Sequence, residues 1–386
     1  MWNIVFVGDE QAPQVTWRSD PYTVVKSTPV IREKPYLTFE NGNYAVQVPT
    51  LKSNVAGTSW SRSDSLDSVN AIPISDFYIA KAGKDNADSL NTALGQRKHL
   101  ILTPGIYHLD RSLDVAHTGT VILGLGMATL IPDNGTSAIT IADVDGVSVT
   151  GLIFDAGPHQ DFPLLVVGPT GSNTTDHCNN PTALFDLCCR VGGATVGSTQ
   201  TCFVVNSSDV IMDNVWIWRA DHGRPGTVEW DVNPAETGLV VNGNNVIAYG
   251  LFVEHFQGFQ TIWNGDGGQV YFYQSELPYD PPYQGSWQQG QGPGETPVNG
   301  FASYKVADTV NTHTAQGLGV YCNFTKAKVW CDNAIEAPTK DGVKLSHMVT
   351  VWLDGKEKEK DASGINHVFN RLGDKVTGPV TLKATL

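Results

Sequence analysis

The sequence has few charged residues and no excess of basic ones. Charged side chains make up 17% of its 386 residues, below the roughly 25% of an average soluble domain. Acidic residues number 39 against 25 basic ones, which gives a formal net charge of −14. Phosphate backbones are bound by clustered Lys and Arg, so this balance argues against a nucleic-acid partner. No apolar run approaches the length of a transmembrane helix, and no membrane span is expected.

The six cysteines include no CxxC pair. They are Cys178, Cys188, Cys189, Cys202, Cys322 and Cys331. The histidines near them lack the spacing of zinc ligands, so we expect no metal. An even number of cysteines in a Gly-rich chain with little charge favours disulfides in an oxidising compartment, with buried free thiols as the alternative.

Four glycosylation sequences point to the same compartment. They begin at Asn134, Asn173, Asn206 and Asn323. The segment Met1–Gly8, however, has no basic region, only a short apolar run, and no cleavage site of small residues. We therefore interpret the sequence as part of a longer, secreted glycoprotein with disulfide bonds.

The chain divides into an irregular first part and a repetitive second part. Residues 1–70 mix short apolar strands with Pro-containing loops and end in a Ser- and Asn-rich connector over Ser53–Asn70. Residues Asp88–Leu94 suit one short helix. We expect residues 71–386 to form a single domain that follows the connector.

Four later segments can be aligned with one another. They begin at Asp143, Asn206, Asn242 and Asn264. Each opens on a polar turn and continues with alternating apolar positions, a pattern that predicts strands. Strand–turn–strand repeats without helices between them are typical of a parallel β-solenoid. An antiparallel sandwich needs hairpin turns and shorter spacing, so we predict an all-β fold, a parallel β-helix.

The spacing of the repeats is consistent with this fold. Asn242 and Asn264 are 22 residues apart (264 − 242), which suits one coil. Asn206 and Asn242 are 36 residues apart (242 − 206), which suits a coil with an inserted loop, here Asp221–Thr237. The pair Asn244–Asn245 falls in a turn, where a ladder of Asn side chains is the simplest interpretation.

Two glutamates occupy the same position in consecutive repeats. Glu254 and Glu276 would stack on neighbouring coils, with their strands about 4.8 Å apart. Two carboxylates so close repel each other, and one should keep its proton near neutral pH. The apolar setting of Leu277–Tyr279 should favour Glu276 as that acid. Such a pair suits cleavage of a glycosidic bond. The alternative is that one or both point into solvent.

Aromatic residues gather in the same part of the chain. The candidates for contact with sugar rings are Trp218, Trp263, Tyr279 and Trp287. Their rings suit the apolar faces of sugars, although any of them could instead belong to the core. Asp221, at the start of the inserted loop, could bind sugar hydroxyls or support the acid, or form a salt bridge with Arg219 or Arg224.

Three motifs carry a resemblance to a known family. The runs Val253–Gln257, Trp263–Gly265 and Tyr273–Asp280 resemble glycoside hydrolase family 55, the exo-β-1,3-glucanases or laminarinases of fungi and bacteria. The likeness extends from about Arg32–Tyr36 through Asn299–Asp308.

This resemblance implies two right-handed parallel β-helices with a cleft between them. It further implies an inverting enzyme that uses no metal or cofactor and releases glucose from the non-reducing end of β-1,3-glucan. Glu276 matches the general acid, and Glu254 matches a carboxylate that helps to hold the nucleophilic water. Tyr279, Trp218 and Asp221 match the wall that contacts the sugar, and Trp263 and Trp287 are further candidates for it.

The chain resembles only the second half of such an enzyme. A second β-helix domain or chain is therefore an expected partner beside the glucan, and the site is expected to be incomplete without it. Inverting enzymes also keep the acid and base about 6.5–9.5 Å apart, wider than bare stacking of strands.

Two other functions remain open from the residues. One is a β-helical lyase or polygalacturonase-like hydrolase, although neither calcium ligands beside Arg or Lys nor a paired-Asp pattern with Gly-His-Gly is visible. The other is a glycan-binding β-helix that is not an enzyme.

Overall fold

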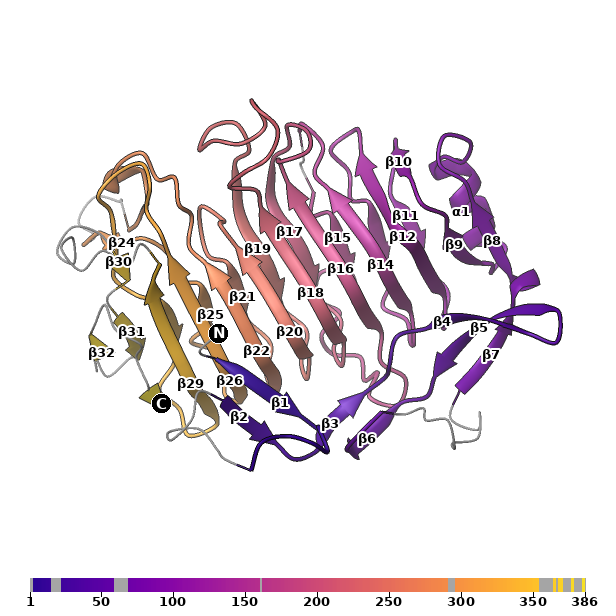
Figure 1. Ribbon diagram of the computed structural model, residues 1–386, viewed down its shortest axis with the longest axis horizontal. Coiled ribbons are helices and arrows are strands. Elements are labelled where there is room, and N and C mark those ends of the chain that lie inside the picture. The colour runs from indigo at the N-terminus through magenta and orange to yellow at the C-terminus, as the bar shows by residue number, and fades with distance from the viewer. Residues whose placement is uncertain are drawn as a thin grey trace.

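The computed structural model describes residues 3–14, 22–58, 69–159, 162–290 and 296–353, together with the backbone of four short strands beyond residue 353. Two long sheets run through this part of the chain (Figure 1). Within it, no helix has the length and apolar character that crossing a membrane requires.

The first sheet contains the longer strands. They are β8 (Phe77–Ala80), β9 (His99–Leu102), β10 (Ile106–Leu109), β12 (Val121–Pro132), β14 (Ser148–Asp155), β16 (Ala183–Val191), β18 (Ile211–Arg219), β20 (Ile247–Glu254), β22 (Gly268–Glu276), β26 (His313–Cys322), β29 (Val343–Trp352) and β33 (Ala384–Thr385). All neighbours in it pair in parallel except β29 and β33.

The second sheet takes the shorter strands between them. They are β11 (Leu113–Val115), β13 (Ile139–Ile141), β15 (Leu165–Val167), β17 (Thr199–Val205), β19 (Ala235–Val241), β21 (Thr261–Trp263), β25 (Tyr304–Val306), β28 (Ile335–Ala337), β31 (His367–Asn370) and β32 (Val376–Thr377). The chain alternates between the two sheets, and each pass lies beside the one before it. The prediction of a parallel β-helix is confirmed.

The aligned repeats stack in the predicted register. Ile211 pairs with Ile247, and Ile247 pairs with Gln269. A coil that the alignment missed lies between the first two repeats, because β16 separates β14 from β18. The turn before β16 contains Asn179–Asn180, but Pro181 and Thr182 follow it, whereas the repeats that begin at Asp143, Asn206 and Asn242 have a Val immediately before the strand.

The core is the column of side chains inside the coils. One stack runs straight through five neighbouring strands of the first sheet and has no exposed surface: Leu130, Phe154, Cys189, Ile217 and Val253. Residues at alternate positions of these strands face outward, so the period-2 pattern of the sequence separates core from surface.

The structure pairs none of the six cysteines in a disulfide, which contradicts the predicted disulfides, and the alternative of buried thiols fits most of them. Cys189, Cys202, Cys322 and Cys331 lie in the core. Burial raises the pKa of the Cys188 thiol to about 12, which keeps it protonated and unreactive. The four core cysteines act as small apolar side chains of the coil interior.

Polar side chains stack at the turns as well. Asn242 Nδ2 donates to Asn206 Oδ1, and Asn264 Nδ2 donates to Asn242 Oδ1, both at 2.8 Å. The expected Asn ladder therefore exists, but on the first residues of the aligned repeats. Asn245 instead donates to Asp209 Oδ1 at 3.1 Å.

The described residues up to Pro73 form short strands outside the coils. They are β1 (Ile4–Val7), β2 (Tyr22–Val25), β3 (Thr28–Ile31), β4 (Tyr36–Glu40), β5 (Asn43–Pro49), β6 (Lys52–Val55) and β7 (Val69–Pro73). This N-terminal strap runs along the lower part of the first sheet, from β26 and β22 at one end to β9 and β8 at the other (Figure 1). Tyr249 OH donates to Val30 O at 2.7 Å in its middle.

The predicted boundary at residue 70 falls inside β7, and residues 59–68 of the predicted connector lie outside the described part of the chain. The division into 1–70 and 71–386 stays a prediction. The predicted helix is present as α1 (Ala87–Gly95), which the side chain of Asn86 caps by accepting from Ser89 N. The remaining short elements are η2 (Ile74–Asp76), η3 (Gln284–Ser286), β23 (Gln288–Gln289), β24 (Val298–Asn299), β27 (Trp330–Cys331) and β30 (Gly364–Ile365).

Candidate active site

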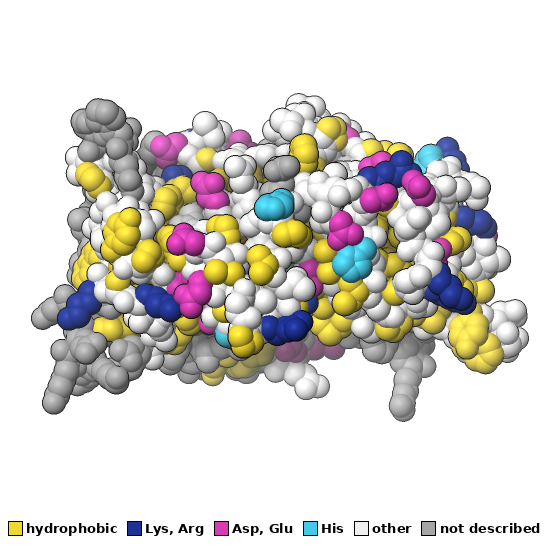
Figure 2. All heavy atoms as spheres, turned by 90° about the horizontal axis from the view of Figure 1, so that it is seen from above, with side chains coloured by type: hydrophobic (Ala, Val, Ile, Leu, Met, Phe, Trp, Pro, Cys, Tyr) yellow, Lys and Arg dark blue, Asp and Glu magenta, His cyan; other side chains and the backbone are white. Residues whose placement is uncertain are grey.

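The two glutamates lie side by side where the first sheet ends. Glu254 is the last residue of β20, and Glu276 is the last residue of the neighbouring strand β22. Phe252 pairs with Gln274, two residues before each glutamate, and His255 N donates to Glu276 O at 2.7 Å. The predicted stacking on neighbouring coils is confirmed. Figure 2 looks down on this end of the molecule, where acidic side chains and histidines lie among uncharged ones.

Glu254 is the more buried of the pair. Its exposed fraction is 7%, and Trp216 Nε1 donates to its Oε2 at 2.8 Å. Burial, with a smaller contribution from the nearby carboxylates of Glu276 and Asp221, raises the pKa of Glu254 to about 7 against the lowering effect of the bond from Trp216. A carboxyl that keeps its proton near neutral pH is therefore present, as the repulsion argument predicted.

The prediction had placed that effect at Glu276, because Leu277 is apolar. Leu277 lies in the core instead, and the side chain of Glu276 is 22% exposed. Tyr279 OH donates to Glu276 Oε2. Burial, and then this carboxylate, raise the pKa of Tyr279, so the phenol stays a donor. Glu276 can thus meet a substrate, and Tyr279 fixes its orientation.

A buried histidine links the carboxyl groups. His255 Nε2 lies 3.8 Å from Glu276 Oε2 and 3.6 Å from Asp221 Oδ1, and Nδ1 lies 3.1 Å from Leu277 O. Since a carbonyl only accepts, Nδ1 carries the proton of the neutral ring. Burial lowers the pKa of His255 against the effect of the two carboxylates. Sequence reasoning gave His255 no role, although it follows Glu254 directly.

Asp221 faces this cluster and does not pair with Arg219. Its Oδ1 accepts from His222 Nδ1 at 2.8 Å, while Arg219 binds Asp280 with two contacts of 2.9 Å. The salt bridge from Asp221 to Arg219, one of the alternatives, is therefore excluded. Among the described residues, no group of three or more His, Cys, Asp or Glu side chains is placed to hold a metal ion.

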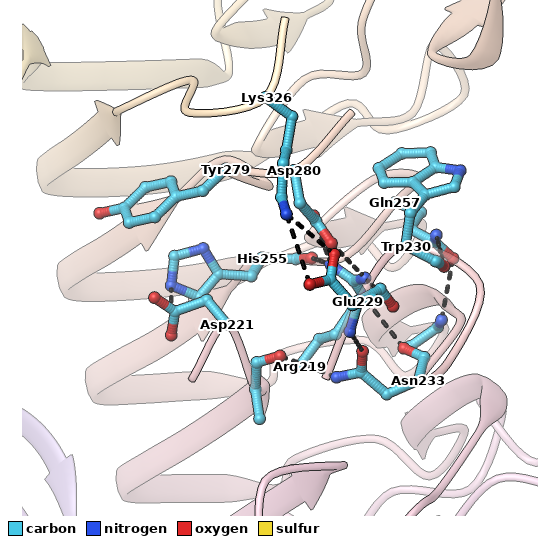
Figure 3. A network of polar contacts seen from close by, with 12 residues as sticks. Arg219, Asp221, Glu229, Trp230, Asn233, His255, Gln257, Tyr279, Asp280 and Lys326 are labelled. Atoms are coloured by element: carbon cyan, nitrogen blue, oxygen red, sulfur yellow. Dashed lines mark hydrogen bonds and ion pairs between the residues drawn. The ribbon is translucent and has the colours of Figure 1, made fainter. Parts of the chain in front are cut away.

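The buried guanidinium of Arg219 joins the loops around the site. The side chain is 1% exposed and, besides Asp280, donates to the carbonyls of Asn233, His255 and Glu229. Lys326 Nζ contacts Glu229 Oε2 at 3.1 Å in the same network (Figure 3). We call Arg219, Glu229, Asn233 and Asp280 the Arg219 wall. It fixes the inserted loop against the segment after β22.

Two tryptophans alternate on the outer face of β18 beside the carboxyl groups. Trp216 and Trp218 stack with ring centroids 5.4 Å apart and planes 23° apart, and Trp216 is 42% exposed. Trp218 pairs in register with Glu254. Trp218 therefore lies beside the pair of carboxyl groups, as a sugar contact at this site requires. Trp216 was missed, although its spacing of two from Trp218 signals the same outward face.

Trp263 and Trp287 are wrongly predicted as substrate contacts. Both have no exposed surface. Trp263 occupies an inward position of β21 and packs against Tyr304 and His313 inside the coil. Trp287 packs against Phe324. Both rings fill the core and cannot reach a ligand.

The chain matches a known family and a curated protein. A family model described as the LAM55 pectate lyase-like domain matches residues 77–276. A protein of Streptomyces sp. (strain SirexAA-E / ActE) named exo-beta-1,3-glucanase is 42% identical over 383 residues, which are 99% of this chain and 60% of that protein. The chain thus spans less than two thirds of the length of this curated relative.

Two solved structures superpose on the whole chain. One is sacteLam55A from Streptomyces sp. SirexAA-E, with a TM-score of 0.89 and 41% identity over 100% of this chain and 67% of that one. The other is a variant of the same protein in complex with glucose, with a TM-score of 0.91, 42% identity and the same coverage.

Proposed function

Because the chain belongs to glycoside hydrolase family 55, we propose that it hydrolyses laminarin-type β-1,3-glucan from the chain end, with inversion and release of glucose. The stacked pair Glu254 and Glu276, beside the exposed ring of Trp216 and the half-buried ring of Trp218, is the observation that carries this proposal. The name of the 42% identical relative and the glucose complex of the superposed structure support the same substrate class.

We assign the leaving-group proton to Glu276. Glu276 is 22% exposed against 7% for Glu254, so it is the one that can reach a glycosidic oxygen. Glu276 gives its proton to that oxygen as the bond to C1 breaks, and a water oxygen forms the new bond from the opposite face.

Glu254, the buried neighbour of the acid, helps to hold the water. The water loses its proton to a carboxylate base, so the atoms and charges balance. Neighbouring strands lie about 4.8 Å apart, less than the 6.5–9.5 Å that an inverting pair needs. We therefore propose that a second β-helix domain or chain contributes to holding the water, and that Glu254 and Glu276 form one side of the site.

The sugar is held by the residues around the pair. Trp216 and Trp218 offer apolar ring faces to a pyranose, and Asp221 and Tyr279 offer polar groups to its hydroxyls. Asp221 is 22% exposed, like Glu276, and both carboxyl groups lie near His255 Nε2. Trp263 and Trp287 take no part.

Product analysis with laminarin tests the proposal. We expect glucose alone from the chain, and α-glucose first when the anomer is followed by NMR. A ladder of oligomers would contradict exo action, and β-glucose first would contradict inversion. Binding of laminarin without any product would favour the non-catalytic glycan-binding alternative for the chain by itself.

Substitution separates the roles of the two glutamates. Glu276→Gln should lower turnover of laminarin by about 10²–10⁴-fold but spare hydrolysis of an aryl glucoside whose phenol leaves without protonation. Glu254→Gln should lower both. Glu40→Gln, an exposed glutamate of the N-terminal strap, is the matched control. Equal turnover of laminarin by Glu276→Gln and the unsubstituted chain rules out the acid assignment.

We infer that the protein acts outside the cell, because a glucan polymer does not cross a membrane. Asn134 is exposed and could carry a glycan, whereas Asn206 is 4% exposed and donates to Gly168 O at 2.8 Å. The sequence motif at Asn206 is therefore not a usable glycosylation site. Detection of the protein in culture medium, with or without a mass increment at Asn134, tests both statements.

A further inference from the structure

A second cavity lies behind the Arg219 wall, away from the two glutamates. Figure 3 shows Tyr279, His255 and Asp221 on one side of this wall and Trp230 and Gln257 on the other. Trp230 and Gln257 line the cavity, whose volume is about 550 Å³. This lies within the range of about 300–1,000 Å³ that small-molecule sites occupy. The proposed mechanism makes no use of it.

The fold holds this cavity in a fixed shape. Gln257 Oε1 accepts from Ala235 N at 3.0 Å and its Nε2 donates to Trp230 O at 2.7 Å, so this side chain ties the inserted loop to β19. The guanidinium of Arg219 lies 5.7 Å from the centre of the Trp230 ring. Phe301, which also lines the cavity, packs edge-on against Phe259, with the ring centroids 5.3 Å apart. The rings of Trp230 and Phe301 are thus each held in place by a neighbouring side chain that does not line the cavity.

The lining suits a neutral ligand with many hydroxyl groups. Trp230 and Phe301 are half-buried rings, and the polar side chains Gln200, Asp231 and Glu236 are exposed. None of the residues that line the cavity is Lys, Arg or His. Carboxylates with no cation beside them repel anionic ligands but accept strong hydrogen bonds from hydroxyls. Ring faces bordered by amides and carboxylates are what a sugar ring needs.

Two of these groups form a pair on the second sheet. Thr199 pairs with Ala235 and Thr201 pairs with Thr237, so Gln200 of β17 lies beside Glu236 of β19. The amide can donate and the carboxylate can accept, which matches neighbouring hydroxyls of one sugar. Both side chains project from regular strands, so they can be removed without disturbing the coil.

We propose that this cavity is a second glucan-binding site, which holds a stretch of β-1,3-glucan while a chain end reaches Glu276. The choice of β-1,3-glucan as ligand rests on the proposed function, whereas the preference for a neutral, hydroxylated ligand rests on the lining alone. Because the inserted loop forms a wall of both spaces, the two sites are held at a fixed separation.

Calorimetric titration of the full chain with a laminarin oligosaccharide tests this site. All proteins carry Glu276→Gln so that the ligand is not consumed. We expect two binding equivalents per chain. The double variant Gln200→Ala/Glu236→Ala should bind one equivalent, or bind the second one about tenfold more weakly. Trp218→Ala should remove the other equivalent. Glu40→Ala/Asn43→Ala is the matched control, because Glu40 and Asn43 are also exposed neighbours on paired strands.

The outcomes separate the two proposals. A single equivalent that Trp218→Ala abolishes, with affinity unchanged by Gln200→Ala/Glu236→Ala, overturns the second site and leaves the proposed function intact. Failure of every protein to bind the oligosaccharide overturns the glucan assignment of both sites. Thermal unfolding of each variant confirms that lost binding reflects lost contacts.

Discussion

At the scale of single residues, Glu254 is a buried carboxyl group with a raised pKa. It lies at the end of a core strand, and its only described side-chain hydrogen bond comes from Trp216. Its carboxylate form is therefore poorly solvated and is repelled by Glu276 and Asp221. The protein tolerates this cost at a position that a purely structural role would fill with an uncharged residue, which is typical of functional sites.

This burial makes stability depend on pH in a defined direction. The pKa of Glu254 rises from 4.5 to about 7 on folding, so the folded chain binds its proton more tightly than the unfolded chain does. The stability that this tighter proton binding contributes is fully present below pH 4.5 and is lost as the pH rises through about 7. Relative to the wild type, Glu254→Gln should therefore gain about 3 kcal/mol of unfolding free energy between about pH 4 and about pH 8.

Urea unfolding of both proteins at the two pH values measures this difference. Glu40→Gln serves as control, since an exposed glutamate should show no such dependence. A Glu254→Gln protein whose stability relative to wild type is the same at both pH values would show that the carboxyl is ionised at little cost.

Sequence reasoning found Glu254 and Glu276 because a repeat places equivalent residues at equivalent positions of neighbouring coils. It could not tell which of them is buried, since that depends on where Leu277 and Trp216 point. It also misassigned Trp263 and Trp287, where the identity of the residue was weighed above its inward position in the alternation. His255 was overlooked because its role comes from distances across three strands.

At the scale of elements, the Arg219 wall joins two loops that are far apart in the sequence. The inserted loop follows β18, and Asp280 follows β22. Their relative position sets the distance between Asp221, from the first loop, and Tyr279, which precedes Asp280. The site therefore depends on an ion pair that no substrate touches.

Removing one partner of this pair should be costly. Arg219→Met leaves Asp280 and three carbonyl groups without their donor, and we expect a loss of about 3–5 kcal/mol in unfolding free energy. Turnover of laminarin should fall with it, because Tyr279 and Asp221 lose their spacing. The double variant Arg219→Met/Asp280→Leu should recover part of the stability, since no charge is then left unpaired. If Arg219→Met unfolds at the wild-type urea concentration, the wall is not what holds the loops.

The Asn ladder offers a test with an internal comparison. Asn242 takes part in two rungs and Asn264 in one of them. At about 1 kcal/mol for each hydrogen bond, Asn242→Ala should lose about twice the unfolding free energy that Asn264→Ala loses. Equal losses, measured by urea unfolding, would mean that the rungs contribute no net stability.

The elements that sequence reasoning could predict are those with a repeated local pattern. β18, β20 and β22 share the alternation and the polar turn, and all three were aligned correctly. β16 was missed because Pro181 and Thr182 follow its Asn turn, where three of the other repeats have an apolar Val before the strand, although its own alternation is regular. The inserted loop was located by length alone, and nothing in its sequence states that it folds around a buried arginine from the preceding strand.

At the scale of the whole molecule, the N-terminal strap counteracts a weakness of all solenoids. Each coil contacts only its neighbours, so a solenoid can open one coil at a time. The strap contacts coils from β26 to β9. Asn3, at one end of it, has no exposed surface, donates to the carbonyls of Tyr273 and Gly317, and accepts from Tyr321 OH.

Asn3→Ala should therefore loosen one end of the molecule selectively. With three hydrogen bonds lost, we expect about 2–3 kcal/mol less stability locally, seen as faster hydrogen exchange in β1, β22 and β26. Exchange in β12 and β14 should not change, because other parts of the strap cover that end. Asn43→Ala, in an exposed hairpin, is the control. Uniformly faster exchange along all coils would show that the molecule unfolds as one unit.

The excess of acidic residues has a consequence for mixtures of polysaccharides, although Figure 2 shows Lys and Arg side chains among the acidic ones on the face that it views. A chain of net charge −14 repels polymers that carry uronate or sulfate groups before any linkage is contacted. Neutral glucans approach freely. The protein thus discriminates between polysaccharides by charge at long range and by ring contacts at short range. Added salt should remove only the discrimination by charge, because screening at physiological ionic strength already acts within about 8 Å.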